Sequence, residues 1–319
     1  MSTLTAPQKL AKGRGDTLCA EAETRLNAFS LFGFGAKDKF SEAAEKFKMA
    51  GNQYKLGTCW EEAGNAYSKA ASNFGASDEK LEDINATVDA AQCYKKDRLC
   101  ADKAIAAFEK AIDAYNMSGR FSRSGQYLKE VAEIHEANED WESAVEVYEQ
   151  AAQIQLSDNK RTAADKLLIQ AASLLADKVN DYARAAGTYL TIGTQCMESN
   201  LGKFAAKGHF FCYLLCLTAM GDCVALSEGI EKCKEIDYSF STSRECTFME
   251  SISIAMQEQE LPDYATACAE FDNITPLDPW KTSLLLKGRQ HIQVDVGEGD
   301  EGGDVVEDEG EAGDDDDLL

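Results

Sequence analysis

The chain has 319 residues, 44% of them hydrophobic, and four prolines, so it can bury a large core and keep long helices uninterrupted. Its formal net charge is −24, but residues 295–319 hold 13 acidic residues and no lysine or arginine, which leaves −11 for the rest. A nucleic-acid-binding role is not expected, because counterion release requires a net basic surface.

The cysteines exclude a disulfide framework. There are eleven, an odd number, scattered from Cys19 to Cys268 with no C-x-x-C pair. They are interpreted as small core residues in a reducing compartment. No apolar run is long enough for a membrane span, and the N-terminus lacks the apolar core of a signal peptide. We therefore expect a cytoplasmic protein that associates with membranes only peripherally.

Two ladders of small residues run through the chain. An alanine followed four residues later by an aromatic residue recurs in steps of 41, 40 and 41 residues, at Ala63/Tyr67, Ala104/Phe108, Ala144/Tyr148 and Ala185/Tyr189. A second set steps by 41, 41 and 40 residues, at Ala50, Ala91, Ala132 and Ala172. The offset ladders indicate two helices per repeat. They predict an all-α, right-handed solenoid of TPR-like antiparallel helical hairpins with a period of about 40 residues.

The ladders divide the chain into regions. Residues 1–16 are polar and are expected to be a flexible N-terminus, ending at Asp16 as the N-cap of the first helix. Residues 17–208 are assigned to the solenoid. The stretch 208–217 is apolar on all sides, which predicts burial on more than one face. Residues 209–293 are therefore expected to form a C-terminal helical bundle that caps the array.

The last part of the chain has clear start and stop signals. Asp278 is the predicted N-cap of the final helix, with Pro279 at its first position. Residues 294–319 contain mainly glycine, acidic and small residues, a composition that predicts a disordered acidic tail. This tail ends in Leu318 and Leu319.

An apolar segment at residues 29–36 interrupts the first helices. It crowds four large apolar residues around two glycines, namely Phe29, Leu31, Phe32 and Phe34. Either these side chains fold back onto neighbouring helices, or they face outwards as a shallow membrane wedge. Each phenylalanine transferred from water contributes roughly 1.5 to 3 kcal/mol, so three or four would give weak, reversible attachment.

Basic residues gather near the ends of successive hairpins. They are Lys95, Lys96 and Arg98, then Arg120 and Arg123, then Lys160, Arg161 and Lys166, then Lys203 and Lys207. We expect them to recur at corresponding ends of successive hairpins, so that stacking of the repeats could align them into a basic stripe along one edge or face. The alternative is an ordinary solvated surface.

The chain lacks the patterns of an enzyme. It has no glycine-rich phosphate loop, no nominated nucleophile with a base, and three histidines far apart with no ligand spacing, at His135, His209 and His291. We expect a non-enzyme with no cofactor, no metal and no small-molecule substrate.

Several motifs resemble the soluble NSF attachment proteins, most closely the α type and its Sec17-like relatives. The resemblance covers residues 17–294 and the last two residues. It is strongest in F-S-L-F-G at 29–33, the block at 49–67, G-R-F at 119–121, A-A-K-x-x-F-F at 205–211, S-R-E-C at 243–246 and L-D-P-W at 277–280. The apolar loop and the L-D-P-W helix favour the α type, or the closely similar β type, over the γ type.

This resemblance implies an adaptor that coats the post-fusion SNARE bundle, recruits the hexameric AAA ATPase NSF and stimulates it. The apolar loop would insert into the membrane. The basic positions facing the SNARE complex would be Lys96, Arg120, Lys166, Lys207 and Arg244. One departure is Gln126, where the family has a lysine, with Arg123 nearby as compensation.

The resemblance places the NSF-binding end at the C-terminus. Its acidic surface would include Glu258 and Glu260, with Gln257 replacing an expected acid, and the stimulating leucine would be Leu318 or Leu319. A second departure is the tail, because about 24 residues separate the last helix from the leucines. We interpret the tail as a tether that reaches a basic surface on NSF; the alternative is a purely solubilising tail.

Two other functions remain open from the residues alone. A helical-repeat cochaperone that grips peptides would have a small concave basic clamp and no use for the apolar loop. A scaffold with no ATPase partner would not need Leu318 or Leu319.

Overall fold

The protein is described here by a computed structural model covering residues 4–27, 36–199 and 202–292. Within those residues, the first nine α-helices are α1 Ala6–Asn27, α2 Ala36–Leu56, α3 Trp60–Ala76, α4 Lys80–Tyr94, α5 Ala101–Met117, α6 Phe121–Ala137, α7 Trp141–Ser157, α8 Arg161–Leu174 and α9 Tyr182–Cys196. The others are α10 Lys203–Met220, α11 Cys223–Ile236, α12 Arg244–Gln257, α13 Leu261–Ile274 and α14 Pro279–Arg289. Short 3-10 turns at Arg98–Cys100 (η2) and Tyr238–Thr242 (η4) and a π-helical turn at Leu175–Val179 (η3) complete them.

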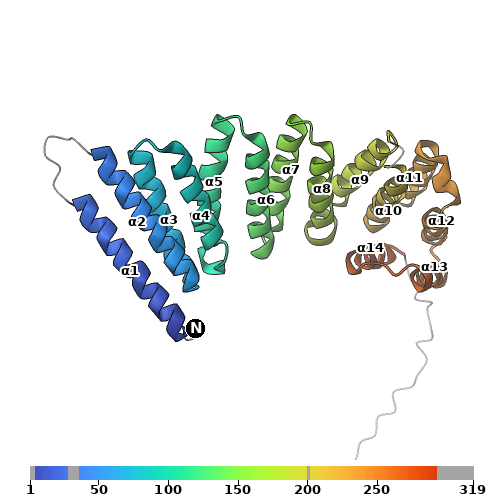
Figure 1. Cartoon of the computed structure of the whole chain (residues 1–319). Coiled ribbons are helices and arrows are strands. Elements are labelled where there is room, and N and C mark those ends of the chain that lie inside the picture. Colours follow the sequence, from blue (N-terminus) through green and yellow to red (C-terminus); the bar gives the residue numbers. More distant parts are fainter. Residues whose placement is uncertain (1–3, 28–35, 200–201, 293–319) are drawn as a thin grey trace, which may run out of the picture.

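Helices α1 to α13 follow one another in chain order in a curved row, and α14 turns back towards α10 (Figure 1). From α1 to α13, each helix packs against the next one along the chain. Both alanine ladders lie in these contacts, and all eight alanines are 0% exposed. The paired aromatic rings are at most 2% exposed. The prediction of an all-α array of helical hairpins is therefore confirmed.

The N-terminal region differs from the prediction. Helix α1 begins at Ala6, so residues 6–16 are helical, and Asp16 lies inside the helix instead of capping it. The Tyr54 hydroxyl donates a hydrogen bond of 2.7 Å to the Asp16 carboxylate. A Cβ on Gly15 would lie 2.8 Å from the Tyr54 ring, so this glycine allows α1 to approach α2 closely. A stripe of small residues holds the helix, and it carries little hydrophobic signal.

Short turns alternate between two edges of the row. Most turns contain one residue with a positive φ, at Thr58, Asp78, Gly119, Glu139, Asn159, Asn180, Gly221 and Gln259. We call the edge where α1 ends and α2, α4, α6, α8, α10 and α12 begin the upper rim, as it appears in Figure 1. The lower rim is the opposite edge, where these even-numbered helices end.

The C-terminal region packs in a different way. Helix α10 buries ten residues, as its all-round apolar sequence predicts. Helix α14 returns to cover it, so that a Cβ on Gly288 would lie 2.5 Å from Thr218 Cγ2. The ring of Trp280 stacks on Tyr189 of α9 with 6.4 Å between ring centroids. The predicted boundary between residues 208 and 209 falls inside α10, so the array and its cap share this helix.

The final helix begins at Pro279 as predicted, but its cap differs. Asp278 occupies the N-cap position without a side-chain capping hydrogen bond. Its carboxylate instead lies 2.7 Å from Lys281 Nζ. The Tyr264 hydroxyl of α13 donates a 2.7 Å hydrogen bond to the Leu285 carbonyl, which fixes α13 against α14.

Candidate partner-binding surfaces

Five of the six predicted basic residues lie at the upper rim. Arg120 is the N-cap residue of α6, and Arg244 is the first residue of α12. The other three lie within the first two turns of their helices, Arg123 on α6, Lys166 on α8 and Lys207 on α10. Because these helices all begin at the same edge (Figure 1), the five residues follow one another along it. We call them the basic row.

The sixth residue, Lys96, lies elsewhere. It follows the last residue of α4, so it stands at the lower rim. The expectation that all the basic clusters occupy corresponding ends is therefore wrong for Lys95, Lys96 and Arg98, because this cluster follows the end of α4, whereas the other clusters lie near the beginnings of α6, α8 and α10. Lys95 is also engaged by two carboxylates, with Nζ 2.7 Å from Glu130 and 2.6 Å from Glu133. Lys96 itself is exposed.

Most charges of the basic row face solvent without a partner. Arg120, Arg123 and Lys166 are exposed and form no ion pair with any residue that the structure describes. Lys207 Nζ lies 3.7 Å from Glu245, a contact too long for a strong hydrogen bond. The Arg244 guanidinium lies 5.5 Å from the centroid of the Phe271 ring. The row can therefore offer cationic groups to an acidic partner.

A groove of about 590 Å³ runs between α6 and α8 beneath the row. Gln126 and Lys166 both line it, and Tyr148 and Gln155 of α7 contribute to its wall. Burial, together with a hydrogen bond to Glu136, raises the pKa of the Tyr148 hydroxyl, so this group stays neutral. Gln126 and Lys166 are 40 residues apart, one repeat of the sequence. Arg123 does not line the groove, so its charge does not take the place of a lysine at position 126.

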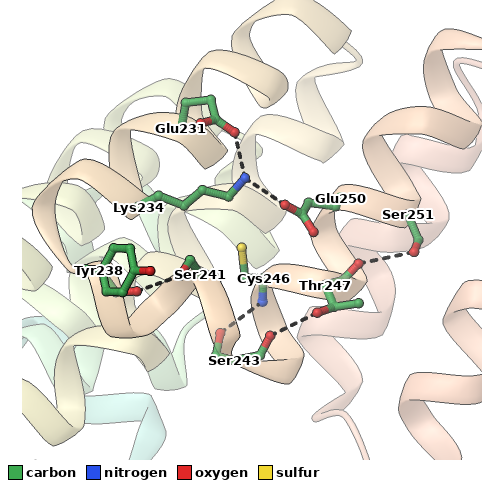
Figure 2. A network of polar contacts seen from close by, with 9 residues as sticks. All are labelled: Glu231, Lys234, Tyr238, Ser241, Ser243, Cys246, Thr247, Glu250 and Ser251. Atoms are coloured by element: carbon green, nitrogen blue, oxygen red, sulfur yellow. Dashed lines mark hydrogen bonds and ion pairs between the residues drawn. The ribbon is translucent and has the colours of Figure 1, made fainter.

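Neighbouring contacts hold the N-terminus of α12, and with it Arg244. Figure 2 shows Lys234 of α11 between two carboxylates, 2.6 Å from Glu231 and 2.7 Å from Glu250 of α12. These hydrogen bonds, first that of Glu231 and then that of Glu250, raise the pKa of Lys234 and keep it charged. The Ser243 hydroxyl accepts a 3.1 Å hydrogen bond from the Cys246 backbone N–H and so caps α12. These contacts fix the start of the helix relative to α11.

The two acidic residues of the predicted NSF-binding surface lie at the lower rim. Glu258 and Glu260 occupy the turn between α12 and α13, and both side chains are exposed. The turn is closed by a 2.9 Å hydrogen bond from the Glu260 backbone N–H to the Ala255 carbonyl, and Gln259 between them has φ 62°. The side-chain amide of Gln257 donates a long hydrogen bond, 3.5 Å from Nε2 to Ser253 Oγ. The acidic pair therefore points away from the basic row.

The predicted membrane loop and terminal leucines fall outside the described residues. These are Phe29, Leu31, Phe32, Phe34, Leu318 and Leu319. Their roles therefore stay predictions. The flanking helix ends are described, since α1 ends at Asn27 and α2 begins at Ala36, both at the upper rim.

Three exposed aromatic residues at the upper rim had not been selected from the sequence. Phe121, Phe204 and Tyr238 are 46%, 83% and 84% exposed. Phe121 and Phe204 lie in the first turns of α6 and α10, and Tyr238 begins the 3-10 turn before α12. The sequence signal for Phe121 and Phe204 is an aromatic residue outside the core ladder and beside an arginine or lysine, whereas Tyr238 has no basic neighbour in the sequence. Such mixed aromatic and cationic surfaces are typical of protein interfaces.

Two further searches were confined to the described part of the chain. It contains no group of three or more His, Cys, Asp or Glu residues arranged to hold a metal ion. None of its helices is both long and apolar enough to cross a membrane. All eleven cysteines are free in the structure, and seven of them are buried.

A row of antiparallel helical hairpins stacked in chain order defines a helical-repeat protein. Residues 13–293 match the sequence model of the family described as "Soluble NSF attachment protein, SNAP". The chain belongs to the soluble NSF attachment protein family, and the resemblance seen in its motifs is confirmed.

Similar proteins come from plants, animals and fungi. The alpha-soluble NSF attachment protein of Vitis vinifera is 34% identical over 280 residues, covering 88% of this chain and 94% of that protein. The beta-soluble NSF attachment protein of Bos taurus is 35% identical over 289 residues, covering 89% and 95%. The vesicular-fusion protein SEC17 of Komagataella phaffii is 30% identical over 290 residues, covering 90% and 95%.

Proposed function

We propose that this chain is an adaptor, not an enzyme, for the disassembly of SNARE complexes in intracellular vesicle trafficking. It binds the post-fusion SNARE bundle, recruits the ATPase NSF and stimulates NSF to pull the bundle apart. It works in the cytoplasm and associates with membranes peripherally. Support comes from family membership over residues 13–293, together with the unpaired cations of the basic row.

The basic row is the proposed contact for the SNARE bundle. Lys166 and Lys207 occupy equivalent positions one repeat apart, and Arg120, Arg123 and Arg244 extend the row to α6 and α12. A row of this kind is complementary to the acidic surface that such bundles expose. Attraction of this type mainly accelerates association and weakens with added salt. Lys96 joins the interface only where the bundle crosses towards the lower rim.

The lower rim near α13 is the proposed contact for NSF. Glu258 and Glu260 are exposed there, at the opposite end of α12 from Arg244. Leu318 and Leu319 are the proposed trigger of NSF's ATPase, delivered by the acidic tail. A chain truncated after Val294 should then bind SNARE complexes but stimulate NSF less than the full chain does.

The apolar segment 29–36 is the proposed membrane anchor. Phe29, Leu31, Phe32 and Phe34 together supply several kcal/mol of transfer free energy, at roughly 1.5 to 3 kcal/mol for each phenylalanine. Double substitution of Phe32→Ser and Phe34→Ser should abolish flotation of the protein with liposomes. A peptide-binding cochaperone would show no dependence on these residues, so the same assay separates the two functions.

The decisive experiment measures NSF ATPase rate and SNARE-complex disassembly together. The full chain should stimulate both, whereas the variant with Leu318→Ala and Leu319→Ala should bind SNARE complexes without stimulating NSF. If the full chain neither binds SNARE complexes nor stimulates NSF, the adaptor function is refuted. If the double variant stimulates as well as the full chain, the tail leucines are not the trigger.

A further inference from the structure

An apolar groove of about 330 Å³ lies between α13 and α14, near the point where the described chain ends. Its apolar lining is Ala265, Cys268 and Ala269 from α13, Leu277 from the connecting turn, and Leu285 and Leu286 from α14. Leu286 remains 53% exposed, which is unusual for a leucine in a packed helix pair. The groove is thus an unfilled apolar surface at the C-terminal end.

A single cation stands at one end of this groove. Arg289 lines it, and the side chain is exposed without an ion pair to any described residue. The groove also contains Asp272, but that carboxylate accepts a 2.8 Å hydrogen bond from the Leu277 backbone N–H and so belongs to the turn. An occupant that combines apolar side chains with a neighbouring carboxylate would match this surface.

The chain itself carries such a segment. Residues 314–317 are four consecutive aspartates, and Leu318 and Leu319 follow them directly. The segment 295–319 has 13 acidic residues and no basic one, so its most favourable contact nearby is an unpaired arginine. The sequence therefore places an acidic and apolar segment on the same chain as the groove.

The connecting chain is long enough to reach the groove. The described residues end at Ile292, three positions after Arg289. A random-coil chain of about 26 residues, the number from Ile292 to Leu318, has a root-mean-square reach on the order of 25 to 30 Å. Helix α14 is only about 16 Å long, so every part of the groove lies within that reach. The effective concentration of such a tethered segment is in the millimolar range.

We propose that Leu318 and Leu319 dock in the α13–α14 groove, with the preceding aspartates beside Arg289, and that the protein thereby conceals its own leucines until a partner withdraws them. This inference deepens the proposed function and rests on it for the role of the leucines. A self-contact with a millimolar dissociation constant would be occupied about half of the time. The leucines would thus be available to NSF and yet shielded from unrelated apolar surfaces.

Cys268 reports directly on the groove, and Cys223 on α11 serves as a control because it is equally half-buried and lies outside the groove. Burial raises the pKa of the Cys268 thiol to about 11, so alkylation will be slow enough to follow by hand. We would measure N-ethylmaleimide modification of each cysteine by mass spectrometry, at low salt and without NSF. Truncation after Val294 should accelerate modification of Cys268 about twofold and leave Cys223 unchanged.

Two variants and a synthetic peptide test the occupant. In the full chain, Leu318→Ser with Leu319→Ser should give the rate of the truncated chain. With Arg289→Glu, the full and truncated chains should react at the same rate, a comparison that cancels the direct effect of Arg289 on the pKa of the Cys268 thiol. Neither change should affect unfolding, because Arg289 is exposed and the leucines lie beyond α14. A synthetic peptide of residues 308–319 added to the truncated chain at millimolar concentration should restore protection.

The proposal is overturned if Cys268 reacts equally fast in the full and truncated chains. It is also overturned if the leucine variant stays as protected as the full chain, since the acidic residues alone would then cover the groove. In either case, protection of Cys268 by the added peptide would not restore the proposal. Because NSF is absent from these measurements, they can fail while the tail leucines still stimulate NSF, and the two failures are distinguishable.

Discussion

Arg244 and Glu258 stand at opposite ends of one helix, since Arg244 begins α12 and Glu258 follows its last residue. The 14 residues of α12 separate them by about 20 Å. The helix therefore carries a residue of the basic row at the upper rim and a residue of the acidic pair at the lower rim. Its start is held to α11 by Lys234 (Figure 2).

This separation predicts that the two partners can be uncoupled. Arg244→Glu should weaken binding to SNARE bundles by about five- to tenfold, since reversing one exposed charge costs on the order of 1 kcal/mol, and it should leave NSF recruitment to saturated complexes unchanged. Glu258→Lys should instead weaken NSF recruitment and leave binding to SNARE bundles unchanged. Binding to immobilised SNARE complexes, with and without NSF, measures both effects. Loss of both activities in both variants, with unchanged circular dichroism, would show that α12 does not separate the partners.

Restoring a lysine at Gln126 should strengthen SNARE binding. Gln126 lines the groove beside Lys166, so Gln126→Lys adds a cation to the basic row at the equivalent position of the preceding repeat. An exposed charge pair contributes about 0.2 to 1 kcal/mol, so affinity should rise about 1.5- to fivefold and should depend more steeply on salt.

A matched control for this variant is Gln153→Lys. Gln153 is also exposed, but it lines a groove between α5 and α7 on the opposite face. It adds the same charge without changing the basic row. Equal gains in affinity for both variants would mean that the net charge of the protein sets the affinity, and not the position of the added lysine beside Lys166.

Two glycines should respond in opposite ways to alanine. Gly288→Ala places a Cβ 2.5 Å from Thr218 Cγ2 and 2.9 Å from the Thr218 carbonyl oxygen, so it should push α14 away from α10. We expect a loss of about 1 to 3 kcal/mol in the free energy of unfolding. Gly208→Ala in α10 meets nothing within 4 Å and should gain about 0.5 to 1 kcal/mol. Urea unfolding measures both changes. If Gly288→Ala leaves the free energy of unfolding unchanged, α14 is not closely packed against α10.

His209 should make the protein less stable in mild acid. Burial lowers the pKa of this imidazole below its ordinary value, an effect that the nearby Asp165 only partly offsets. The unfolded chain therefore binds the proton more readily than the native protein does. Stability should be unaffected above about pH 6.5, the ordinary pKa of histidine, and should fall as the pH drops below it. Urea midpoints from pH 7.5 to 5 measure this slope.

The control for this pH effect is His209→Gln, which removes the titrating group. Its unfolding midpoint should decline less than that of the unchanged protein over the same range. His135 is a second comparison, because its Nδ1 lies 2.9 Å from the Asp140 carboxylate and it has a charged partner. An identical decline in the unchanged protein and His209→Gln would assign the pH dependence to other groups.

The sequence predicted the repetitive part of the fold well. The alanine and aromatic ladders report burial directly, because each of their residues meets a neighbouring helix in every repeat. The first turns of α1 could not be predicted in the same way. That helix is held by Ala11, Gly15 and the Asp16–Tyr54 hydrogen bond. In the sequence alone, small and charged residues of this kind are typical of a polar, exposed segment.

The candidate surfaces were predicted in part. Lys166 and Lys207 were identified through the resemblance, and their helices place them at one rim. The position of Lys96 required knowing that α4 ends where α6 does, at the lower rim, because the direction of the chain reverses at each turn. The groove beside Arg289 could not be predicted from the sequence either, because no repeat relates α14 to α13 and so no pattern indicates how the two helices pack.

The return of α14 onto α10 has a consequence for synthesis of the protein. Gly288 and Thr218 meet across 70 positions of the chain, whereas the hairpins of the row form from neighbouring helices. At about 5 to 20 residues per second, a ribosome needs about 3 to 14 seconds to make the chain between α10 and the end of α14. For that time the face of α10 that packs against α14 has no cover, and we expect nascent chains at this stage to be the species that chaperones bind.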